Sequence, residues 1–359
     1  MVTRAFYITA DKVGIVTGGG TVTKKEAEAL GADTLIFDRE AVDPTHLDRT
    51  DPFIFDQLAL ARIELLLAAG TIPRIAHFYA GTFGATIRRL RQAGVKVAYT
   101  CAAHDRKASI EEFERHGHAY PFAHIRDDAL FARYIDGYLQ ADVLVCPSQH
   151  SADVMRGYGC SRVVVIPHGV VERASAPAPM PKTFRVGYFG AIGYDKGLRY
   201  LLEAWKRLAY TDATLLLGGR DSEDALPWIR GHGGGNIQVV GYVETLASFH
   251  NRCSVYVQPS VTEGFGIEIL EAMAYGRPVI CSTGAGGVDV VTDGVTGFRV
   301  PIRSPEKIAE RIAWCREHPA EVVEMGRNAH KLTERYTWTL VQDQYRAAWN
   351  NLLGERFFA

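Results

Sequence analysis

Two glutamates and two glycines in one short stretch have the residue types and the spacing to bind a ligand. Glu263 and Glu271 are separated by seven residues, and Gly264 and Gly266 lie between them. The stretch follows a short apolar run and precedes a predicted helix that begins near Gly266. Glycine lets the backbone approach a ligand closely. The spacing therefore indicates a ligand-binding loop between a strand and a helix.

The backbone at the start of this predicted helix supplies hydrogen-bond donors. The first N–H groups of a helix have no acceptor within it, and the helix dipole attracts anions to this end. We expect the N–H groups of Phe265, Gly266 and Ile267 to bind a diphosphate or sugar hydroxyls. Glu271 is expected to accept two hydrogen bonds from a ribose diol, whereas Glu263 faces the group beyond the phosphates. The alternative is a strand–helix junction with solvated carboxylates.

The stretch from residue 254 to residue 282 resembles the retaining glycosyltransferases of family 4, which have the GT-B fold. Their signature places two glutamates, with seven residues between them, in the run E-G-F-G…E-A-M-A-x-G-x-P-V-I. Here the run extends from Glu263 to Ile280. The resemblance implies that Glu263 is catalytic, because it orients the hydroxyls of the donor sugar and stabilises positive charge on that sugar. Glu268 is either a surface carboxylate or shares the face of Glu271.

A second segment, GYFGAIGYDKG, resembles the opening of the donor-binding domain in the same family. The resemblance implies that Lys196 is catalytic, because it offsets the charge of the departing diphosphate, and that Gly190 contacts the donor. Ala191 stands where relatives carry an arginine that helps to neutralise the diphosphate. We expect helix-start N–H groups or another basic residue to replace that arginine, and the candidates are Arg199, Arg220 and Lys107.

Three more segments enter the expected site through the same resemblance. Gly19 and Gly20 belong to a glycine run before a predicted helix and are expected to lie against the phosphates; the run is not a P-loop, since no G-x-x-x-x-G-K-[ST] occurs. His104 follows a predicted strand and is expected to act on the donor sugar as a catalytic residue. Tyr242 and Val243 are expected to contact the nucleobase. Read alone, the glycines suit a flexible loop and the histidine a structural role.

No metal or cofactor is expected. His116, His118 and His124 lie close together in the sequence, but their run holds proline and glycine and lacks a regular ligand spacing. An acceptor-side loop is the better interpretation of this run. No Asp-x-Asp triplet occurs in the chain, which argues against a metal-dependent glycosyltransferase. The nucleotide sugar is expected to be a donor substrate.

The elements that must position these residues alternate between strands and helices. Short apolar runs rich in β-branched residues occur at 5–10, 34–38, 75–79, 95–101, 142–148, 163–169, 185–191, 213–219, 236–242, 254–260, 278–282 and 297–301. Longer amphipathic segments separate many of them. Strands of this kind predict parallel sheets that are covered by helices on both faces. We therefore expect an α/β protein with two doubly wound, Rossmann-like domains that face a central cleft, as in GT-B.

The domain boundaries follow from breaks in this alternation. We expect an acceptor-side domain at 1–170, a linker at 171–183 and a donor-binding domain at 184–335. The linker carries three prolines, which suit a semi-rigid spacer. Residues 336–359 are expected to form one C-terminal helix with an apolar face, and this helix must bury that face, in part by crossing back to the first domain.

Composition excludes several classes of protein. The 359 residues are 47% hydrophobic and 23% charged, with a net charge of −1, and neither half of the chain is basic. Nucleic-acid binding is therefore disfavoured. Six scattered cysteines without a Cys-x-x-Cys pair suggest buried thiols in a reducing compartment. No apolar window is long enough for a signal peptide or a membrane span, so a cytoplasmic location is expected.

One basic stretch leaves membrane contact as an alternative. Arg88, Arg89 and Arg91 form the basic face of a predicted helix. This face is either solvated or touches anionic lipid at the inner face of the membrane.

The resemblance implies a retaining transfer of a hexose-type sugar from a UDP-, GDP- or ADP-sugar to a glycan, a lipid-linked acceptor or a small molecule. In this family the leaving phosphate serves as the base. Ala191 motivates a second hypothesis, a non-catalytic nucleotide-sugar-binding protein. A GT-B-type epimerase or phosphorylase is a third. A dinucleotide oxidoreductase is disfavoured, because no G-x-G-x-x-G follows the first strand with an acidic partner.

Overall fold

The computed structural model describes residues 5–10, 18–38, 53–101, 105–219, 226–233 and 236–358. The chain divides into two compact units. The first consists of Met1–Ala103, Tyr120–His168 and Trp338–Ala359, and the second of His104–Ala119 and Gly169–Thr337. The segment at 104–119 thus belongs with the second unit, although its neighbours in the sequence on both sides belong to the first.

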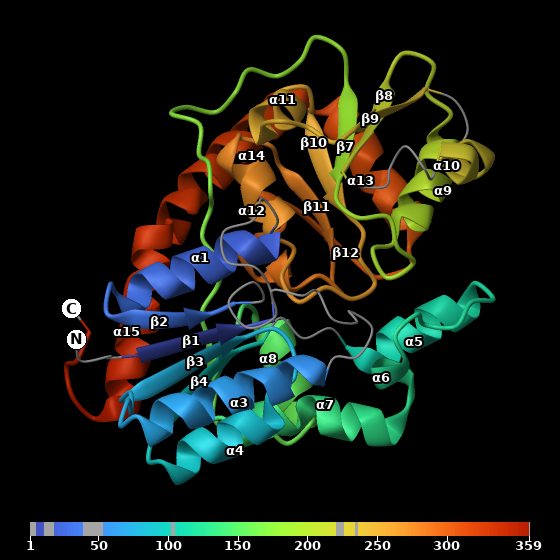
Figure 1. The fold of residues 1–359 in the computed structure, drawn as a ribbon. Coiled ribbons are helices and arrows are strands. Elements are labelled where there is room, and N and C mark those ends of the chain that lie inside the picture. The colour runs from blue at the N-terminus through green and yellow to red at the C-terminus, as the bar shows by residue number, and fades with distance from the viewer. Residues whose placement is uncertain are drawn as a thin grey trace. The chain divides into compact units, whose positions relative to one another are not determined.

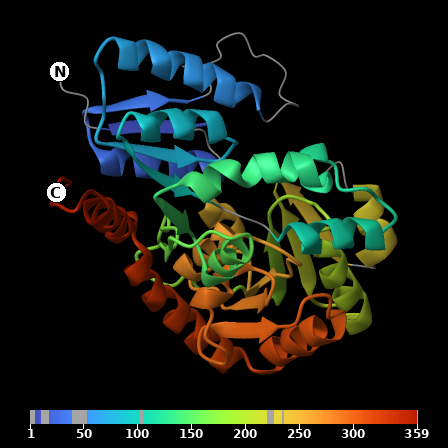
Figure 2. The ribbon, with the colours of Figure 1, turned by 90° about the horizontal axis from the view of Figure 1, so that it is seen from below.

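The first unit is built on a parallel sheet of six described strands in the order β2-β1-β3-β4-β5-β6. Its strands are β1 (Ala5–Thr9), β2 (Thr34–Phe37), β3 (Ile75–Tyr79), β4 (Lys96–Thr100), β5 (Val143–Cys146) and β6 (Val163–Val165). Its helices are α1 (Gly18–Leu30), α3 (Ile54–Ala68), α4 (Gly84–Gln92), α6 (Ala123–Arg126), α7 (Asp128–Gln140), α8 (Gln149–Gly157) and α15 (Trp338–Leu353). Figure 2 shows strands of this unit between helices.

The second unit is built on another parallel sheet, in the order β12-β11-β10-β7-β8-β9. Its strands are β7 (Arg185–Phe189), β8 (Thr214–Gly218), β9 (Ile237–Gly241), β10 (Val255–Gln258), β11 (Val279–Ser282) and β12 (Gly297–Val300). Its helices are α5 (Arg106–Arg115), α9 (Leu198–Leu208), α10 (Leu226–Gly233), α11 (Leu246–His250), α12 (Ile267–Ala274), α13 (Pro305–Glu317) and α14 (Pro319–Leu332), with short 3₁₀ helices at Gly286–Val290 and Thr333–Tyr336.

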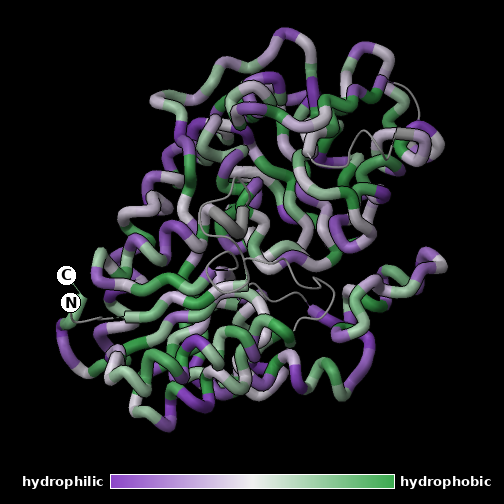
Figure 3. Tube along the Cα trace, viewed as in Figure 1, coloured by the Kyte–Doolittle hydropathy of each residue, from purple (hydrophilic) through white to green (hydrophobic). Residues whose placement is uncertain are grey.

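The predicted strands and the two doubly wound sheets are confirmed. Each of the twelve apolar runs contains one strand of the structure. Strands such as β3, β5 and β10 are buried along their whole length, because helices cover both faces of each sheet (Figure 1). Figure 3 shows hydrophobic segments along these strands. In the second sheet the strand order reverses between β7 and β10, which defines a topological switch point.

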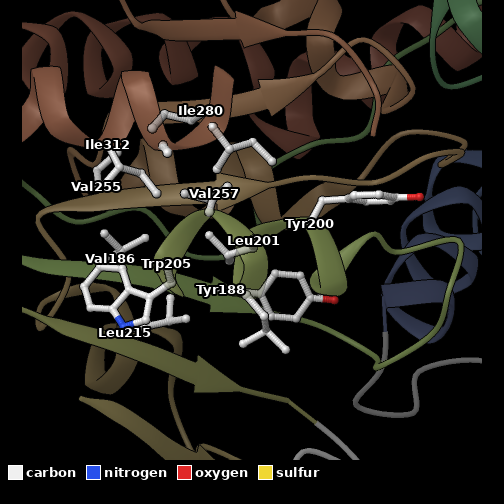
Figure 4. Packing of buried hydrophobic residues seen from close by; sticks show 14 of the residues in the cluster. Val186, Tyr188, Tyr200, Leu201, Trp205, Leu215, Val255, Val257, Ile280 and Ile312 are labelled. Carbon is white, nitrogen blue, oxygen red and sulfur yellow. The ribbon is translucent and has the colours of Figure 1, made fainter. Parts of the chain in front are cut away.

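Packing in the core of the second unit fixes the position of α9. Leu201 and Trp205, one helical turn apart on α9, are buried against β7 and β8 through Val186 and Leu215 (Figure 4). An indole and a leucine side chain each contribute a few kcal/mol when buried in this way. The position of α9, and of the loop that precedes it, is therefore fixed by packing.

The C-terminal helix α15 packs in the first unit. Its apolar face is buried and lies alongside α1 (Figure 1). Tyr345 Oη donates to Glu26 Oε1 at 2.6 Å, and Trp349 Nε1 donates to His77 Nδ1 at 3.1 Å. Burial acts to raise the pKa of Glu26, but its interaction with His77 and the hydrogen bond from Tyr345 outweigh burial and hold that pKa below its usual value.

The tautomer of His77 follows from these contacts. Because Nδ1 accepts from Trp349, the ring proton is on Nε2, which lies 3.2 Å from Glu26 Oε2. The Nε2–H therefore has the carboxylate of Glu26 and, at 3.0 Å, Thr100 Oγ1 within hydrogen-bond distance.

The proline-rich segment between the two sheets is bound to the second unit. Arg277 is fully buried, and its Nη2 donates to the carbonyl oxygens of Ala178 at 2.8 Å and Pro179 at 3.1 Å. The Ala178 N–H donates in turn to the carbonyl of Tyr275 at 3.2 Å. Burial lowers the pKa of Arg277 to about 10. The prolines are thus held in place by hydrogen bonds, beyond the stiffness that they confer themselves.

The predicted burial of the cysteines and the predicted basic helix face can both be compared with the structure. All six cysteines are buried free thiols, which confirms their predicted burial, and burial raises the pKa of Cys146 and of Cys253 to about 12.

Arg88, Arg89 and Arg91 of the basic stretch pair with Asp136, Glu64 and Asp142. Within the described ranges, no helix is both long enough and apolar enough to cross a membrane.

Candidate active site

Lys196 and Glu263 form an ion pair where the order of the second sheet reverses. Lys196 lies in the loop after β7 and Glu263 in the loop after β10, and Lys196 Nζ donates to Glu263 Oε2. Burial alone would lower the pKa of Lys196, but the charges of Glu263 and Glu268 outweigh burial and raise it. Ligands of open parallel sheets bind at such a switch point. The two residues predicted to be catalytic in this unit therefore meet at the expected place.

The two loops are held against each other by a close approach of their backbones. Gly197, the residue before α9, has a φ of 67°. A side chain there would clash with the carbonyl oxygen of Pro259, so the position needs glycine on both counts. The N–H of Val261 donates to the carbonyl of Asp195 at 2.7 Å. The position of Lys196 is therefore determined by contacts with the loop that carries Glu263.

A third loop, after β11, holds the backbone of Glu263 by two hydrogen bonds. The Glu263 N–H donates to the carbonyl of Gly284 at 2.9 Å, and the Glu263 carbonyl accepts from the Gly286 N–H at 2.9 Å. Gly266 then turns the chain into α12 with a φ of 83°. Phe265 is buried, and Ile267 is the first residue of the helix. Helix α12 thus begins four residues after Glu263.

Two further carboxylates lie on α12. Burial and the charge of Glu263 raise the pKa of Glu268. Glu271 is only 8% exposed, and burial, with the charges of Glu268 and Glu172, raises its pKa to about 8. The raised pKa favours the protonated form of Glu271, which is able to donate as well as accept a hydrogen bond.

The carboxyl ends of β7, β8 and β9 bring the other predicted residues of this unit together. The Gly190 N–H donates to the carbonyl of Gly218 at 3.1 Å, and the Gly219 N–H to that of Gly241 at 2.9 Å. Tyr242 follows directly and is 66% exposed, whereas Val243 is half-buried. Gly190 thus follows β7, and Tyr242 and Val243 follow β9, at the same edge of the sheet with β8 between them.

Helix α5 and its cap contact the loops of this site, and one residue of the helix, Glu112, was missed by sequence analysis. Asp105 caps α5 by accepting from the Ala108 N–H at 3.1 Å, and its own N–H donates to Thr262 Oγ1 at 3.0 Å. Glu112, which is fully buried, accepts from Tyr200 Oη at 2.6 Å. These bonds tie α5 to α9 and to the residue before Glu263. Glu112 escaped notice because nothing in its sequence neighbourhood marks this helix face as buried.

His116 and His118 of the histidine-rich run also contact the residues that join α5 to α9. His116 Nε2 lies 3.0 Å from Glu112 Oε1, and its Nδ1 lies 3.0 Å from a terminal nitrogen of Arg199. His116 and His118 both stack on Tyr194, each with ring centroids 5.0 Å apart. Over the described residues, no group of three His, Cys, Asp or Glu side chains is arranged to hold a metal ion.

The remaining predicted residues lie in the other unit, outside the described residues, or on an exposed helix face. Gly19 and Gly20 form the first turn of α1 in the first unit, so they lie inside the helix, whereas the prediction placed them in a loop before it. His104 and Arg220 lie outside the described residues. Lys107 is 85% exposed, and its ammonium lies 3.8 Å from Glu111.

Sequence models of two glycosyltransferase families match the two parts of the chain. The model described as Glycosyltransferase Family 4 matches residues 13–173, and that described as Glycosyl transferases group 1 matches residues 183–318. Together they span both sheets. The chain belongs to the family 4 (group 1) glycosyltransferases.

Curated relatives match over part of their length. The chain is 31% identical over 207 residues to a phosphatidyl-myo-inositol mannosyltransferase of Mycolicibacterium smegmatis, which is 54% of this chain and 53% of the relative. It is 28% identical over 179 residues to the capsular polysaccharide biosynthesis glycosyltransferase CapM of Staphylococcus aureus, 48% of this chain and 47% of the relative. These matches thus span about half the length of each relative.

Solved structures share the whole fold. A sucrose-phosphate synthase from Thermosynechococcus elongatus superposes with a TM-score of 0.79 at 19% identity, covering 98% of this chain and 99% of that one. Anabaena Alr3699/HepE, solved in complex with UDP-glucose, gives 0.71 at 17% identity, covering 97% and 99%. The fold is therefore GT-B, as predicted.

Proposed function

We propose that this protein is a retaining glycosyltransferase that moves a hexose-type sugar from a UDP-, GDP- or ADP-sugar to a glycan, a lipid-linked acceptor or a small molecule. The observation that carries the proposal is the Lys196–Glu263 pair at the switch point, beside the amino end of α12. Breaking a sugar–phosphate bond creates a positive sugar and a negative diphosphate. A lysine and a carboxylate held side by side are suited to stabilise those two charges.

The proposed roles follow the chemistry of each residue. Lys196 and the N–H groups at Phe265, Gly266 and Ile267 bind the diphosphate. Glu263 orients the donor sugar and stabilises its developing positive charge, and Glu271 binds the ribose. We also propose that His104 contacts the donor sugar and that Gly19 and Gly20, at the start of α1, approach the phosphates.

The nucleobase is proposed to lie at the edge formed by Gly190, Tyr242 and Val243. The exposed ring of Tyr242 offers a face for stacking. The solved relative with bound UDP-glucose supports a nucleotide-sugar donor. We propose retention of configuration, because the resemblance to retaining glycosyltransferases implies it. We also propose independence of metal ions, because Lys196 and backbone N–H groups supply positive charge. A reducing, cytoplasmic compartment suits the six buried free thiols.

A nucleotide-binding screen tests the proposal. We expect UDP, GDP or ADP to raise the melting temperature of the protein, since a ligand that binds the folded state stabilises it. Lys196→Met should weaken binding of the responding nucleotide about tenfold or more, whereas the control Lys206→Met, an exposed position on the helix α9 that follows, should not. Glu263→Gln should lower kcat about 100-fold and leave nucleotide affinity nearly unchanged. The control for that variant is Glu321→Gln on the surface of α14.

Unchanged nucleotide affinity in Lys196→Met, together with unchanged turnover in Glu263→Gln, would overturn the proposal. Ala191 favours one competing function, a non-catalytic nucleotide-sugar-binding protein, because the second unit lacks the expected arginine there. Nucleotide-sugar binding without transfer or hydrolysis across a broad acceptor panel would support that function. Products formed from the donor alone, or with inorganic phosphate, would instead indicate an epimerase or a phosphorylase.

A further inference from the structure

A cavity of about 290 Å³ opens in the second unit beside the loop that carries Lys196. It is lined by Phe113 of α5, by Ile192, Gly193 and Tyr194 of the loop after β7, by Arg199 of α9 and by Trp228 of α10. Of these residues, only Arg199 was considered for the donor above, as one candidate to replace the missing diphosphate-binding arginine. The lining is mostly apolar, and its aromatic rings come from three different parts of the unit.

The aromatic walls are held by further ring contacts. Tyr194 is stacked on both His116 and His118, as described above, and Phe113 meets it edge to face at 5.1 Å. Trp228 packs on His232 with the ring centroids 4.8 Å apart. Walls fixed in this way lose little side-chain freedom when a ligand enters.

Arg199 gives the cavity one charged group. Its Nε donates to Glu203 at 3.0 Å, and one terminal nitrogen lies 3.0 Å from His116 Nδ1. The other terminal nitrogen has no hydrogen-bond partner in the described ranges of the chain. One edge of the guanidinium is therefore available to an oxygen atom of a ligand.

The cavity adjoins the proposed catalytic centre through one turn of backbone. The carbonyl of Gly193 accepts from the Lys196 N–H at 3.2 Å, and the carbonyl of Tyr194 accepts from the Gly197 N–H at 3.1 Å. The residues that line the cavity thus also hold Lys196.

We propose that this cavity binds a compact apolar ring of the acceptor, one that carries an acidic oxygen facing Arg199. The proposal rests on the proposed function, because it names the acceptor class of that same site. A sugar ring is a poor occupant, since its hydroxyls would be buried against apolar walls without partners. The volume, at the low end of ligand pockets, suits one or two rings and is too small for a long lipid chain.

Tryptophan fluorescence reads this site directly. Of the five tryptophans, Trp228 and Trp314 are half-buried and the others are buried. We expect the probe 4-hydroxybenzoate to change the fluorescence saturably in the wild type and in the control Trp314→Phe, and the change to be lost in Trp228→Phe. Calorimetry with the same probe measures affinity where the signal is lost.

Two substitutions separate the apolar and charged parts of the cavity. Phe113→Ala should weaken 4-hydroxybenzoate and its uncharged analogue phenol alike, by about fivefold. Arg199→Gln should weaken 4-hydroxybenzoate about tenfold and phenol less than twofold, and Arg199→Lys should restore part of the loss. Circular dichroism and nucleotide-induced stabilisation show whether each variant is folded.

The outcomes are distinct. Tighter binding of methyl β-glucoside or decanoate than of 4-hydroxybenzoate, no saturable binding of 4-hydroxybenzoate, or affinity unchanged by both Phe113→Ala and Arg199→Gln would overturn the proposal. Because the probe is measured without nucleotide, binding of the probe by a protein that binds no nucleotide would leave the cavity in place and contradict the proposed function. Binding of nucleotide without binding of the probe would contradict the proposed cavity and leave the proposed function in place.

Discussion

Arg303 donates from Nε to Oε2 of Glu112 at 2.6 Å, although 191 positions separate the two residues. Glu112 is fully buried and also accepts from Tyr200 and lies within hydrogen-bond distance of His116. Burial acts to raise the pKa of Glu112, but the hydrogen bonds from Tyr200 and Arg303 outweigh it and lower that pKa. One carboxylate therefore joins α5 to α9 and to the loop between β12 and α13.

Glu112→Gln should lower the free energy of unfolding by about 2–3 kcal/mol, because it leaves Arg303 without its buried counter-charge. Urea unfolding monitored by circular dichroism measures this. The matched control is Glu111→Gln on the same helix, whose carboxylate is 49% exposed and lies 3.8 Å from Lys107; it should change stability by less than about 0.5 kcal/mol. Equal effects of the two substitutions would show that the buried contact contributes nothing.

Gly197→Ala should disturb the site by pushing the two loops apart. The added Cβ would clash with the Pro259 carbonyl, and the left-handed backbone adds about 1 kcal/mol of strain. We expect the affinity for nucleotide to fall about tenfold or more, measured by calorimetry. Gly94→Ala is the control, since Gly94 has a φ of 81° with nothing near its missing side chain; it should cost about 1 kcal/mol of stability and leave affinity unchanged. A normal affinity in Gly197→Ala would refute the argument.

Glu271 should make stability depend on pH in a specific window. Its pKa in the folded protein, about 8, lies above the usual value of 4.5 for the unfolded chain. The folded state therefore holds a proton that the unfolded state has lost, so stability is fully present below about pH 4.5 and falls as pH rises to about 8. Relative to Glu271→Gln, the wild type should lose on the order of a few kcal/mol between pH 5 and pH 9.

Chemical denaturation of both proteins at pH 5, 7 and 9 measures that difference and cancels other titrating groups, since they are common to both. A difference that stays constant with pH would contradict the raised pKa. Such a result would show that burial and the charges of Glu268 and Glu172 do not raise the pKa of Glu271.

Trp349→Phe should cost about 1–2 kcal/mol of stability beyond the lost packing, because His77 Nδ1 then has no donor. Trp338→Phe on the same helix is the control: the Trp338 indole N–H is buried and has no hydrogen-bond partner among the described residues, so its loss should be milder. Nitrogen-15 spectra of the His77 ring should show the Nε2–H form near neutral pH in the wild type. The Nδ1–H form there would refute the assigned network.

Sequence reasoning recovered the strands because each is a short apolar run between polar segments. β5 and β10, for example, are buried along their length, and such strands leave a direct compositional signal. Lys196 and Glu263 were each found through a local motif. That the two form an ion pair was not predictable, because the pairing depends on sheet order, which places β7 beside β10.

Helix α5 shows why other parts of the site were missed. Its fully buried side chains are Ser109 and Glu112, which are both polar. A hydropathy pattern therefore predicts that this face of the helix is exposed, although it is packed. A polar residue is buried there because partners from α9 and from residue 303 satisfy it, and those partners lie far away in the sequence. Likewise, the raised pKa of Glu271 comes from burial, which no local pattern reports.

The division of the chain has a consequence for its synthesis. Glu26 is made early, but the hydroxyl of Tyr345 that donates to it is made 319 residues later. A ribosome therefore completes the whole second unit before the first unit receives its last helix. Until then the carboxylate of Glu26 and the ring of His77 lack the partners that α15 supplies. The part of the protein that is translated first is the part that finishes folding last.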